Sequence, residues 1–303
     1  MKSFFPVILF DFAMMNYYIT SGKYNFTDEI PGVFMKLRDC FWIWGHHAGC
    51  HHTGEAAAYK IPGENRMGPW EGAEYLGIPN CCRVVFNGIP EPPFDAESEK
   101  LKQFKKVIWS VLGDASSKRN DESGDDLAEV LRQAEKYPNV VGGVLDDLFR
   151  PATKDARLTP DDLHRIADRL HNAPQKLSLW LVYYAALFDI DYTPWLKAVD
   201  GITFWSWNSE QLAQAEQNLN RIISMTPGKE HYAGCYLYNY GDTCPLTLEE
   251  MKFQMDLYYR FLREGKIKGV IVCSNTIADT GLEAPEYLRQ WMIGHGDEEL
   301  NLK

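Results

Sequence analysis

The stretch VVGGVLDD at residues 140–147 decides the fold class, because it joins a continuous apolar run to a polar end. It is too short for an isolated helix and lacks the alternation of a half-exposed strand, so it predicts a strand buried on both faces. Amphipathic, helix-like sequence follows it and most of seven further runs of the same kind. These are CFWIWGHH from Cys40, CRVVFNG from Cys82, VIWSVLGD from Val107, LSLWLVYY from Leu177, GITFWSWN from Gly201, YAGCYLYNYGD from Tyr232 and GVIVCSN from Gly269.

Eight buried strands alternating with helices predict an α/β protein built as a closed (β/α)8 TIM barrel. A chain of 303 residues has room for one such barrel, which needs about 250 residues, and for a short addition. We therefore expect residues 1–38 to form an N-terminal extension that packs on the barrel, and residues 39–303 to form the barrel domain. Because the C-terminal strand ends of such barrels carry the chemistry, these ends supply the candidate site residues.

Charge and composition limit the partners. The net charge of −11 and the pI near 5.2 argue against nucleic acid and anionic membranes, since both need clustered Lys and Arg. The apolar start, MKSFFPVILFDFAMMNYY, is interrupted by Pro6 and Asp11 and is too short to span a bilayer, so no membrane partner is expected. The high aromatic content, 13% of residues, instead favours a small carbohydrate or oligosaccharide ligand. The oligomeric state stays open.

The seven cysteines, an odd number, lie mostly in or beside the predicted strands. Free cysteines commonly behave as small buried hydrophobic residues, so we expect reduced thiols rather than a disulfide framework. This favours a cytoplasmic protein. A protein whose secretion signal had already been removed would also show no such signal in this sequence, so an exported protein stays as the alternative.

Three carboxylates at strand ends are the candidate catalytic groups. Asp146 and Asp147 end the fourth predicted strand, and strand alternation predicts that only one of them faces the pocket, with Asp147 nearer to its mouth. Asp114 ends the third strand and is either a second catalytic carboxylate or a turn residue. Cleavage of a glycosidic bond needs two carboxylates, one that protonates the leaving oxygen and one that acts as nucleophile or activates water.

Rings and amides at the other strand ends are the candidate substrate-binding groups, since rings stack on sugar faces and amides hold hydroxyls. In the pairs Trp205/Trp207 and Tyr238/Tyr240 we expect the second ring at the open end of the barrel and the first to fill its interior. That all four rings form core is the competing interpretation. The full candidate set is Trp44, His46, His47, Asn87, Tyr184, Trp205, Trp207, Tyr238, Asn239, Tyr240 and Asn275.

The loop after the first strand carries His46, His47, His51 and His52 with Cys50 among them, all residue types that bind zinc. Their spacing matches no common zinc pattern, and strands five and six end in Tyr and Trp rather than in the histidines that amidohydrolase-type metal enzymes need. The sequence therefore predicts no metal and no cofactor, and it assigns His46 and His47 to hydrogen bonding with a sugar hydroxyl or to an acid/base relay. The loops after strands seven and eight carry acids and few glycines, which predicts an unphosphorylated ligand.

On VVGGVLDDLF at strand four, TFWSW at strand six and the aromatic strand seven, residues 40–295 resemble the broad group of TIM-barrel glycoside-hydrolase-like proteins. The acid at the end of strand four is similar in position to one used by many retaining glycosidases. The chain departs from the largest glycosidase clan, which has Asn-Glu at strand four and a second Glu at strand seven. The resemblance implies a carbohydrate-active enzyme, a glycoside hydrolase above all. A non-catalytic carbohydrate-binding barrel and a metal-dependent hydrolase or sugar isomerase that uses the His46–His52 loop are the alternatives.

Overall fold

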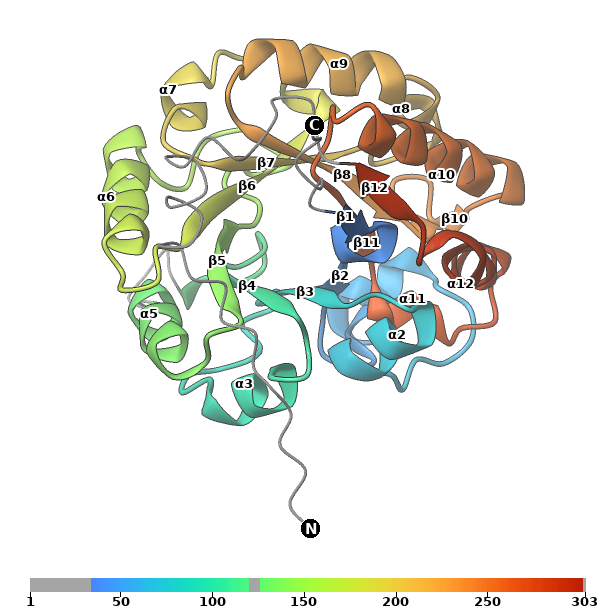
Figure 1. Ribbon diagram of the computed structural model, residues 1–303, viewed down its shortest axis with the longest axis horizontal. Helices are drawn as coiled ribbons and strands as arrows, with labels where there is room; N and C mark the ends of the chain where they lie inside the picture. Colours follow the sequence, from blue (N-terminus) through green and yellow to red (C-terminus); the bar gives the residue numbers. More distant parts are fainter. Residues whose placement is uncertain (1–33, 120–125, 302–303) are drawn as a thin grey trace, which may run out of the picture.

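Eight parallel strands close into a barrel, in the order β11-β2-β3-β4-β5-β6-β7-β8 (Figure 1). The computed structural model describes residues 34–119 and 126–301. The predicted (β/α)8 TIM barrel is confirmed. Its strands are β2 (Phe41–Gly45), β3 (Asn80–Arg83), β4 (Lys106–Leu112), β5 (Val140–Leu145), β6 (Ser178–Tyr184), β7 (Gly201–Trp205), β8 (Glu230–Tyr236) and β11 (Gly269–Cys273).

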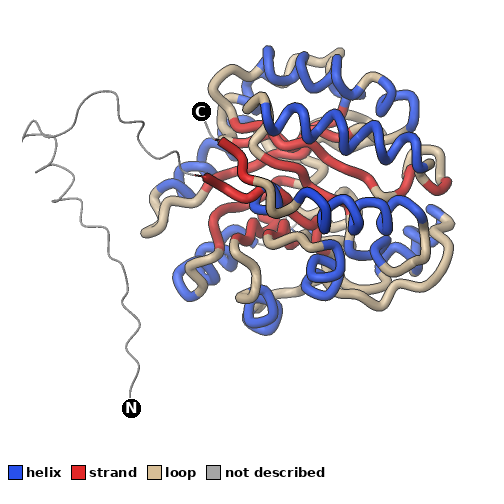
Figure 2. The backbone as a smooth tube through the Cα atoms, turned by 45° about the vertical axis from the view of Figure 1, so that its right-hand side comes forward, coloured by secondary structure: helices blue, strands red, loops and turns tan. Residues whose placement is uncertain are grey.

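Helices surround the strands and bury their outer faces, which explains why the strand sequences are apolar throughout (Figures 1 and 2). Within residues 34–119 and 126–301, no helix is both long and apolar enough to cross a membrane. The helices are α2 (Pro69–Leu76), α3 (Asp95–Leu101), α5 (Asp126–Lys136), α6 (Pro160–His171), α7 (Thr193–Leu196), α8 (Ser209–Ala213), α9 (Ala215–Met225), α10 (Leu248–Arg263), α11 (Asn275–Ala278) and α12 (Glu283–His295), with the 3-10 turns η1 (Leu37–Cys40), η2 (Cys50–His52), η3 (Gly54–Tyr59) and η4 (Ala185–Leu187).

Two of these helices begin at capping boxes. The Thr159 hydroxyl accepts from the backbone N–H of Asp162 at 3.2 Å, and the Asp162 carboxylate accepts from the backbone N–H of Thr159 at 2.8 Å. Thr247 and Glu250 repeat this pair at the start of α10, at 3.2 Å and 2.9 Å. Each box satisfies backbone donors that the first helical turn leaves unpaired, so each helix begins directly after its capping Thr.

The second strand differs from its prediction. The apolar run starting at Cys82 suggested a strand that continues toward Phe86, but β3 spans Asn80–Arg83. Phe86 instead exchanges two backbone hydrogen bonds of 3.0 Å with Ile89. This turn takes the chain out of the barrel ladder. Val84 and Val85 are fully buried, and Phe86 lines a cavity at the strand ends.

Of the predicted N-terminal extension, residues 1–33 lie outside the described residues, so the division at residue 38 stays a prediction. The described part begins with β1 (Phe34–Lys36), which pairs antiparallel with β12 (Glu299–Asn301) near the end of the chain. A second small hairpin, β9 (Tyr238–Asn239) with β10 (Cys244–Pro245), follows β8. Both pairs lie outside the barrel sheet.

Large rings fill the barrel interior in layers. Trp42 of β2 meets Trp180 of β6 edge to face, with ring centroids 5.0 Å apart. Two residues further along β2, Trp44 meets Trp205 of β7 in the same way at 5.4 Å. The second pair lies closer to the C-terminal strand ends, and it separates the packed core from the space above it.

Candidate active site

A cavity of about 600 Å³ lies at the C-terminal ends of the barrel strands. Its position is the one predicted for a TIM-barrel site. Of the predicted site residues, nine line this cavity: Asp114, Asp146, Asp147, Trp44, His46, Tyr184, Trp205, Trp207 and Tyr240. The remaining five, His47, Asn87, Tyr238, Asn239 and Asn275, do not.

Asp146 and Asp147 both line the cavity. The expectation that alternation would turn one of them away is therefore wrong. β5 ends at Leu145, and Asp147 adopts a left-handed backbone with φ 41°. Since side chains alternate only while the strand continues, the turn at Asp147 brings both carboxyl groups to the same space.

Asp146 is a buried acid in surroundings that disfavour its charged form. Burial raises its pKa well above the usual range for Asp, and the neighbouring Asp147 and Asp114 carboxylates raise it further. The Arg157 guanidinium opposes this rise, but it also donates to the carbonyl oxygens of Gly113 and Ser117. Burial and the neighbouring carboxylates therefore favour the protonated form of Asp146, the form that can donate a proton.

Asp147 has a different environment. Burial raises its pKa to about 6, but the backbone N–H of Ala115 donates to its carboxylate at 3.1 Å and the Tyr184 hydroxyl donates at 3.4 Å. These donors favour the charged form, so Asp147 is mostly ionised at neutral pH. Two adjacent carboxyl groups with different protonation states can divide acid and base roles between them.

Asp114 lines the cavity beside this pair, but its carboxylate is already engaged. It accepts from the backbone N–H of Asn87 at 3.0 Å and of Ser116 at 3.2 Å, and the Ser116 hydroxyl also donates to it. These contacts are those of a turn-stabilising Asp. The sequence left turn and catalysis as alternatives for Asp114, and its contacts favour the turn role.

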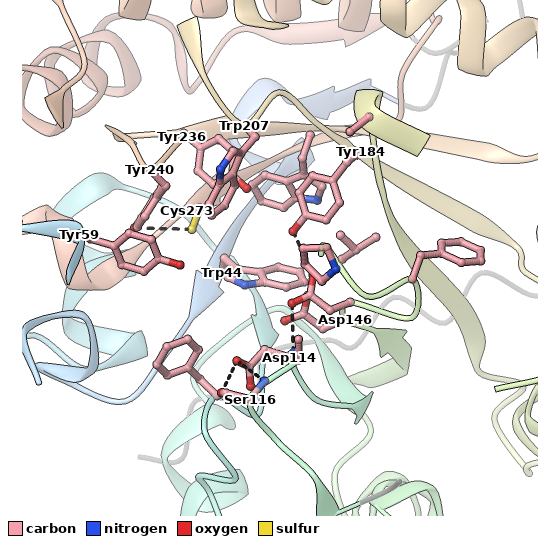
Figure 3. A pocket seen from close by; sticks show the side chains of 18 of the residues that line it. Trp44, Tyr59, Asp114, Ser116, Asp146, Tyr184, Trp207, Tyr236, Tyr240 and Cys273 are labelled. Atoms are coloured by element: carbon pink, nitrogen blue, oxygen red, sulfur yellow. Dashed lines mark hydrogen bonds between the residues drawn. The ribbon is translucent and has the colours of Figure 1, made fainter. Parts of the chain in front are cut away.

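Aromatic rings form the wall across from the acids. Figure 3 shows Trp207, Tyr236 and Tyr240 on the far side of the cavity from Asp146 and Asp114. The Trp207 and Tyr240 rings are nearly parallel, 5.8 Å apart with an interplanar angle of 23°. Trp207 is partly exposed, so one face of this aromatic wall is available to a flat apolar surface such as that of a sugar.

Trp205 and Trp207 both line the cavity. The sequence analysis placed Trp205 inside the barrel and Trp207 at its open end, and β7 ends at Trp205. Trp205 forms the inner part of the cavity lining together with Trp44, and Trp207 lies beyond the strand. The two rings therefore occupy different depths of one cavity.

The sequence analysis missed four Phe and Tyr rings that line the cavity, Tyr59, Phe86, Phe149 and Tyr236. Tyr236 is the last residue of β8. Because site residues of such barrels lie at the C-terminal strand ends, this position could have identified it from the sequence. Tyr59 comes from the η3 turn in the long loop after β2, and no sequence pattern predicts its position. Its ring meets that of Tyr240 edge to face at 5.0 Å.

Tyr238 and Asn239 lie away from the cavity because they belong to the β9–β10 hairpin rather than to the barrel. The Tyr238 ring is fully buried, and its hydroxyl donates to the backbone carbonyl of Tyr59 at 2.7 Å. The Asn239 amide donates to Asp242 and Ser209 at 2.8 Å and 2.6 Å. Both residues hold loops that surround the cavity.

Asn275 positions the loop that carries the histidines. Its amide oxygen accepts from the backbone N–H of His46 at 2.8 Å, and its amide nitrogen donates to the carbonyl oxygens of His46 and Met67 at 3.0 Å and 2.8 Å. Asn87 is a turn residue with φ 50°. His47 lies beside Phe86, with ring centroids 6.5 Å apart.

His46, Cys50 and His51 come together as the residues of the described chain that could hold a metal ion, with one ligand atom from each within 4.8 Å of the others. His46 and His51 also line the cavity. The sequence singled out this loop but found no metal pattern in it, because the ligand spacing depends on the η2 turn.

The raised pKa of Asp147 predicts how stability depends on pH. The folded state favours protonated Asp147, so this contribution is complete below the unfolded pKa of about 3.9 and is lost as pH rises through about 6. Asp147→Asn lacks this titrating group, so its stability should rise relative to that of the wild type between about pH 4 and pH 7. The difference in unfolding free energy, variant minus wild type, should increase by on the order of 3 kcal/mol. Urea unfolding across this range measures the difference, and a difference that falls with pH contradicts the assignment.

No protein-family model and no curated protein matches this sequence. Solved structures do match. The chain shares its fold with TIM-barrel glycoside hydrolases. A protein assigned as an α-L-fucosidase from Bacteroides thetaiotaomicron aligns with a TM-score of 0.54 and 12% identity, over 87% of this chain and 97% of that one. An α-L-arabinofuranosidase from Thermotoga maritima aligns with a TM-score of 0.50 and 12% identity, over 88% of this chain and 72% of that one.

Proposed function

We propose that this protein is a glycoside hydrolase that acts on an unphosphorylated sugar. The observation that carries this proposal is the pair Asp146 and Asp147, two adjacent acids in different environments that face one ring-lined cavity. The fold agrees with this activity, since the solved structures it matches include glycosidases. Among the described residues that line the cavity, Lys154 is the one Lys or Arg, and it donates to the Ala186 carbonyl at 2.8 Å. A phosphorylated ligand would need more cationic groups.

In the proposed reaction, protonated Asp146 gives its proton to the glycosidic oxygen as the bond from that oxygen to the anomeric carbon breaks. Ionised Asp147 either attacks the anomeric carbon or takes a proton from the attacking water. The Tyr184 hydroxyl and the Ala115 N–H hold the Asp147 carboxylate in place. The Trp207 and Tyr240 rings stack on the apolar face of the sugar.

The test is turnover of a panel of 4-nitrophenyl glycosides that covers both anomers of the common neutral hexoses, pentoses and deoxyhexoses. We expect at least one glycoside to be hydrolysed, with saturation kinetics and with the anomeric form of the product observed by NMR. Calorimetric titration of the matching free sugars is run in parallel. Sugar binding without turnover of any glycoside contradicts hydrolysis and instead supports the carbohydrate-binding barrel.

A further inference from the structure

The loop between β2 and α2 brings three soft or borderline ligand groups together in the interior. His46, Cys50 and His51 are 4%, 3% and 4% exposed, and one ligand atom from each lies within 4.8 Å of the others. The two imidazole rings pack against one another with centroids 4.5 Å apart. Phe86 packs on both rings, at 5.2 Å and 5.3 Å. The cluster therefore has the apolar surroundings that proteins use around metal ions.

One nitrogen of the cluster is left without a partner. Nδ1 of His46 is buried and has no hydrogen-bond partner among the described residues. Buried polar atoms in folded proteins are almost always paired, so an orphaned group of this kind indicates a partner such as an ion.

His51 has the outer hydrogen bonds that are typical of a metal-ligating histidine. Its Nδ1 lies 2.8 Å from the Thr276 hydroxyl and 3.0 Å from the Tyr240 hydroxyl. The tautomer in which Nδ1–H donates to Thr276 leaves Nε2 with a free lone pair. Hydrogen bonding at the second ring nitrogen fixes both the tautomer and the ring orientation of such ligands.

We propose that His46, Cys50 and His51 bind a divalent d-block cation of the Zn²⁺ type, with a coordination position open toward the cavity. Three protein ligands plus one open position is the arrangement of catalytic rather than structural zinc sites. Bond lengths of about 2.0–2.3 Å place tetrahedral ligand atoms about 3.3–3.7 Å apart, so the side chains must close by about 1 Å. Cys50 lies on the short η2 turn, and the proposal requires this turn and the two rings to make that adjustment.

The experiment is metal binding by the full chain, measured apart from any enzymatic activity. Purified protein is stripped with a chelator, and Zn²⁺ is titrated in competition with a chromophoric chelator. Co²⁺ is then added as a spectroscopic probe of the ligands. We expect one equivalent of either metal, a near-ultraviolet thiolate-to-cobalt charge-transfer band, and a higher Tm with Zn²⁺. A wild-type protein that binds no stoichiometric metal overturns the proposal.

Substitutions identify the ligands. Cys50→Ser is close to isosteric, and we expect it to remove the charge-transfer band and to weaken Zn²⁺ binding at least 100-fold, as does His46→Gln. His52→Gln on the same turn and Cys244→Ser, an exposed thiol, are the matched controls and keep both signals. Circular dichroism confirms that each variant is folded. Metal binding that survives Cys50→Ser, or that is lost equally in His52→Gln, overturns the assigned ligand set.

Discussion

Asp146→Asn is expected to lower kcat/KM for a hydrolysed glycoside by about 10²–10⁴-fold, the contribution of a general acid. The amide keeps the size of the side chain but has no proton to give to the leaving oxygen. The pKa of Asp146 is raised by burial and by Asp147, which favours its protonated form, and the proposed reaction uses that form as the acid. Steady-state kinetics on the substrate identified by the glycoside panel measures the loss.

The leaving group separates an acid role from a general loss of structure. A glycoside of an acidic phenol needs little protonation, so Asp146→Asn should lose much less activity on a dinitrophenyl glycoside than on an alkyl glycoside. Asp147→Asn lacks the nucleophile or base and should lose activity equally on both. Asp256→Asn, an exposed acid on α10, is the control and keeps wild-type rates. Equal losses in Asp146→Asn on both substrates contradict its assignment as the acid.

The barrel was predictable because its physical cause is local in the sequence. A parallel strand covered on both faces must be apolar along its whole length, so each of the eight strands appears as a short apolar run between polar segments. The same logic placed Asp146, Asp147 and Trp207 at the strand ends, where the cavity lies. The polar residues at the end of each run predicted the position of the site, because the active sites of such barrels lie at the C-terminal strand ends.

The errors at the site occurred where strands end. Alternation predicts the direction of a side chain only within a strand, and it failed at Asp147, where φ is 41°. Tyr238 was assigned to the site because its run continued past Tyr236, whereas the β9–β10 hairpin carries Tyr238 out of the barrel. Tyr59 could not be predicted at all, since a long loop determines its position.

Gly234→Ala is expected to lower the free energy of unfolding by about 3 kcal/mol or more, a large effect for the addition of one methyl group. A Cβ at Gly234 would lie 2.1 Å from two carbon atoms of the Trp205 ring. The ring cannot move aside easily, because its Nε1–H donates to the Thr203 hydroxyl at 2.9 Å and its edge packs on Trp44. Urea unfolding compares the variant with the wild type.

Gly294→Ala is the matched control, since a Cβ at this helical position of α12 meets no atom within 4 Å. Alanine there should raise the free energy of unfolding by about 0.5–1 kcal/mol through its higher helix propensity. Because Trp205 lines the cavity, Gly234→Ala should also weaken sugar binding. Wild-type stability in Gly234→Ala would mean that Trp205 does not pack on β8. The inner part of the cavity would then have a different shape from the one on which the proposed hydrolysis depends.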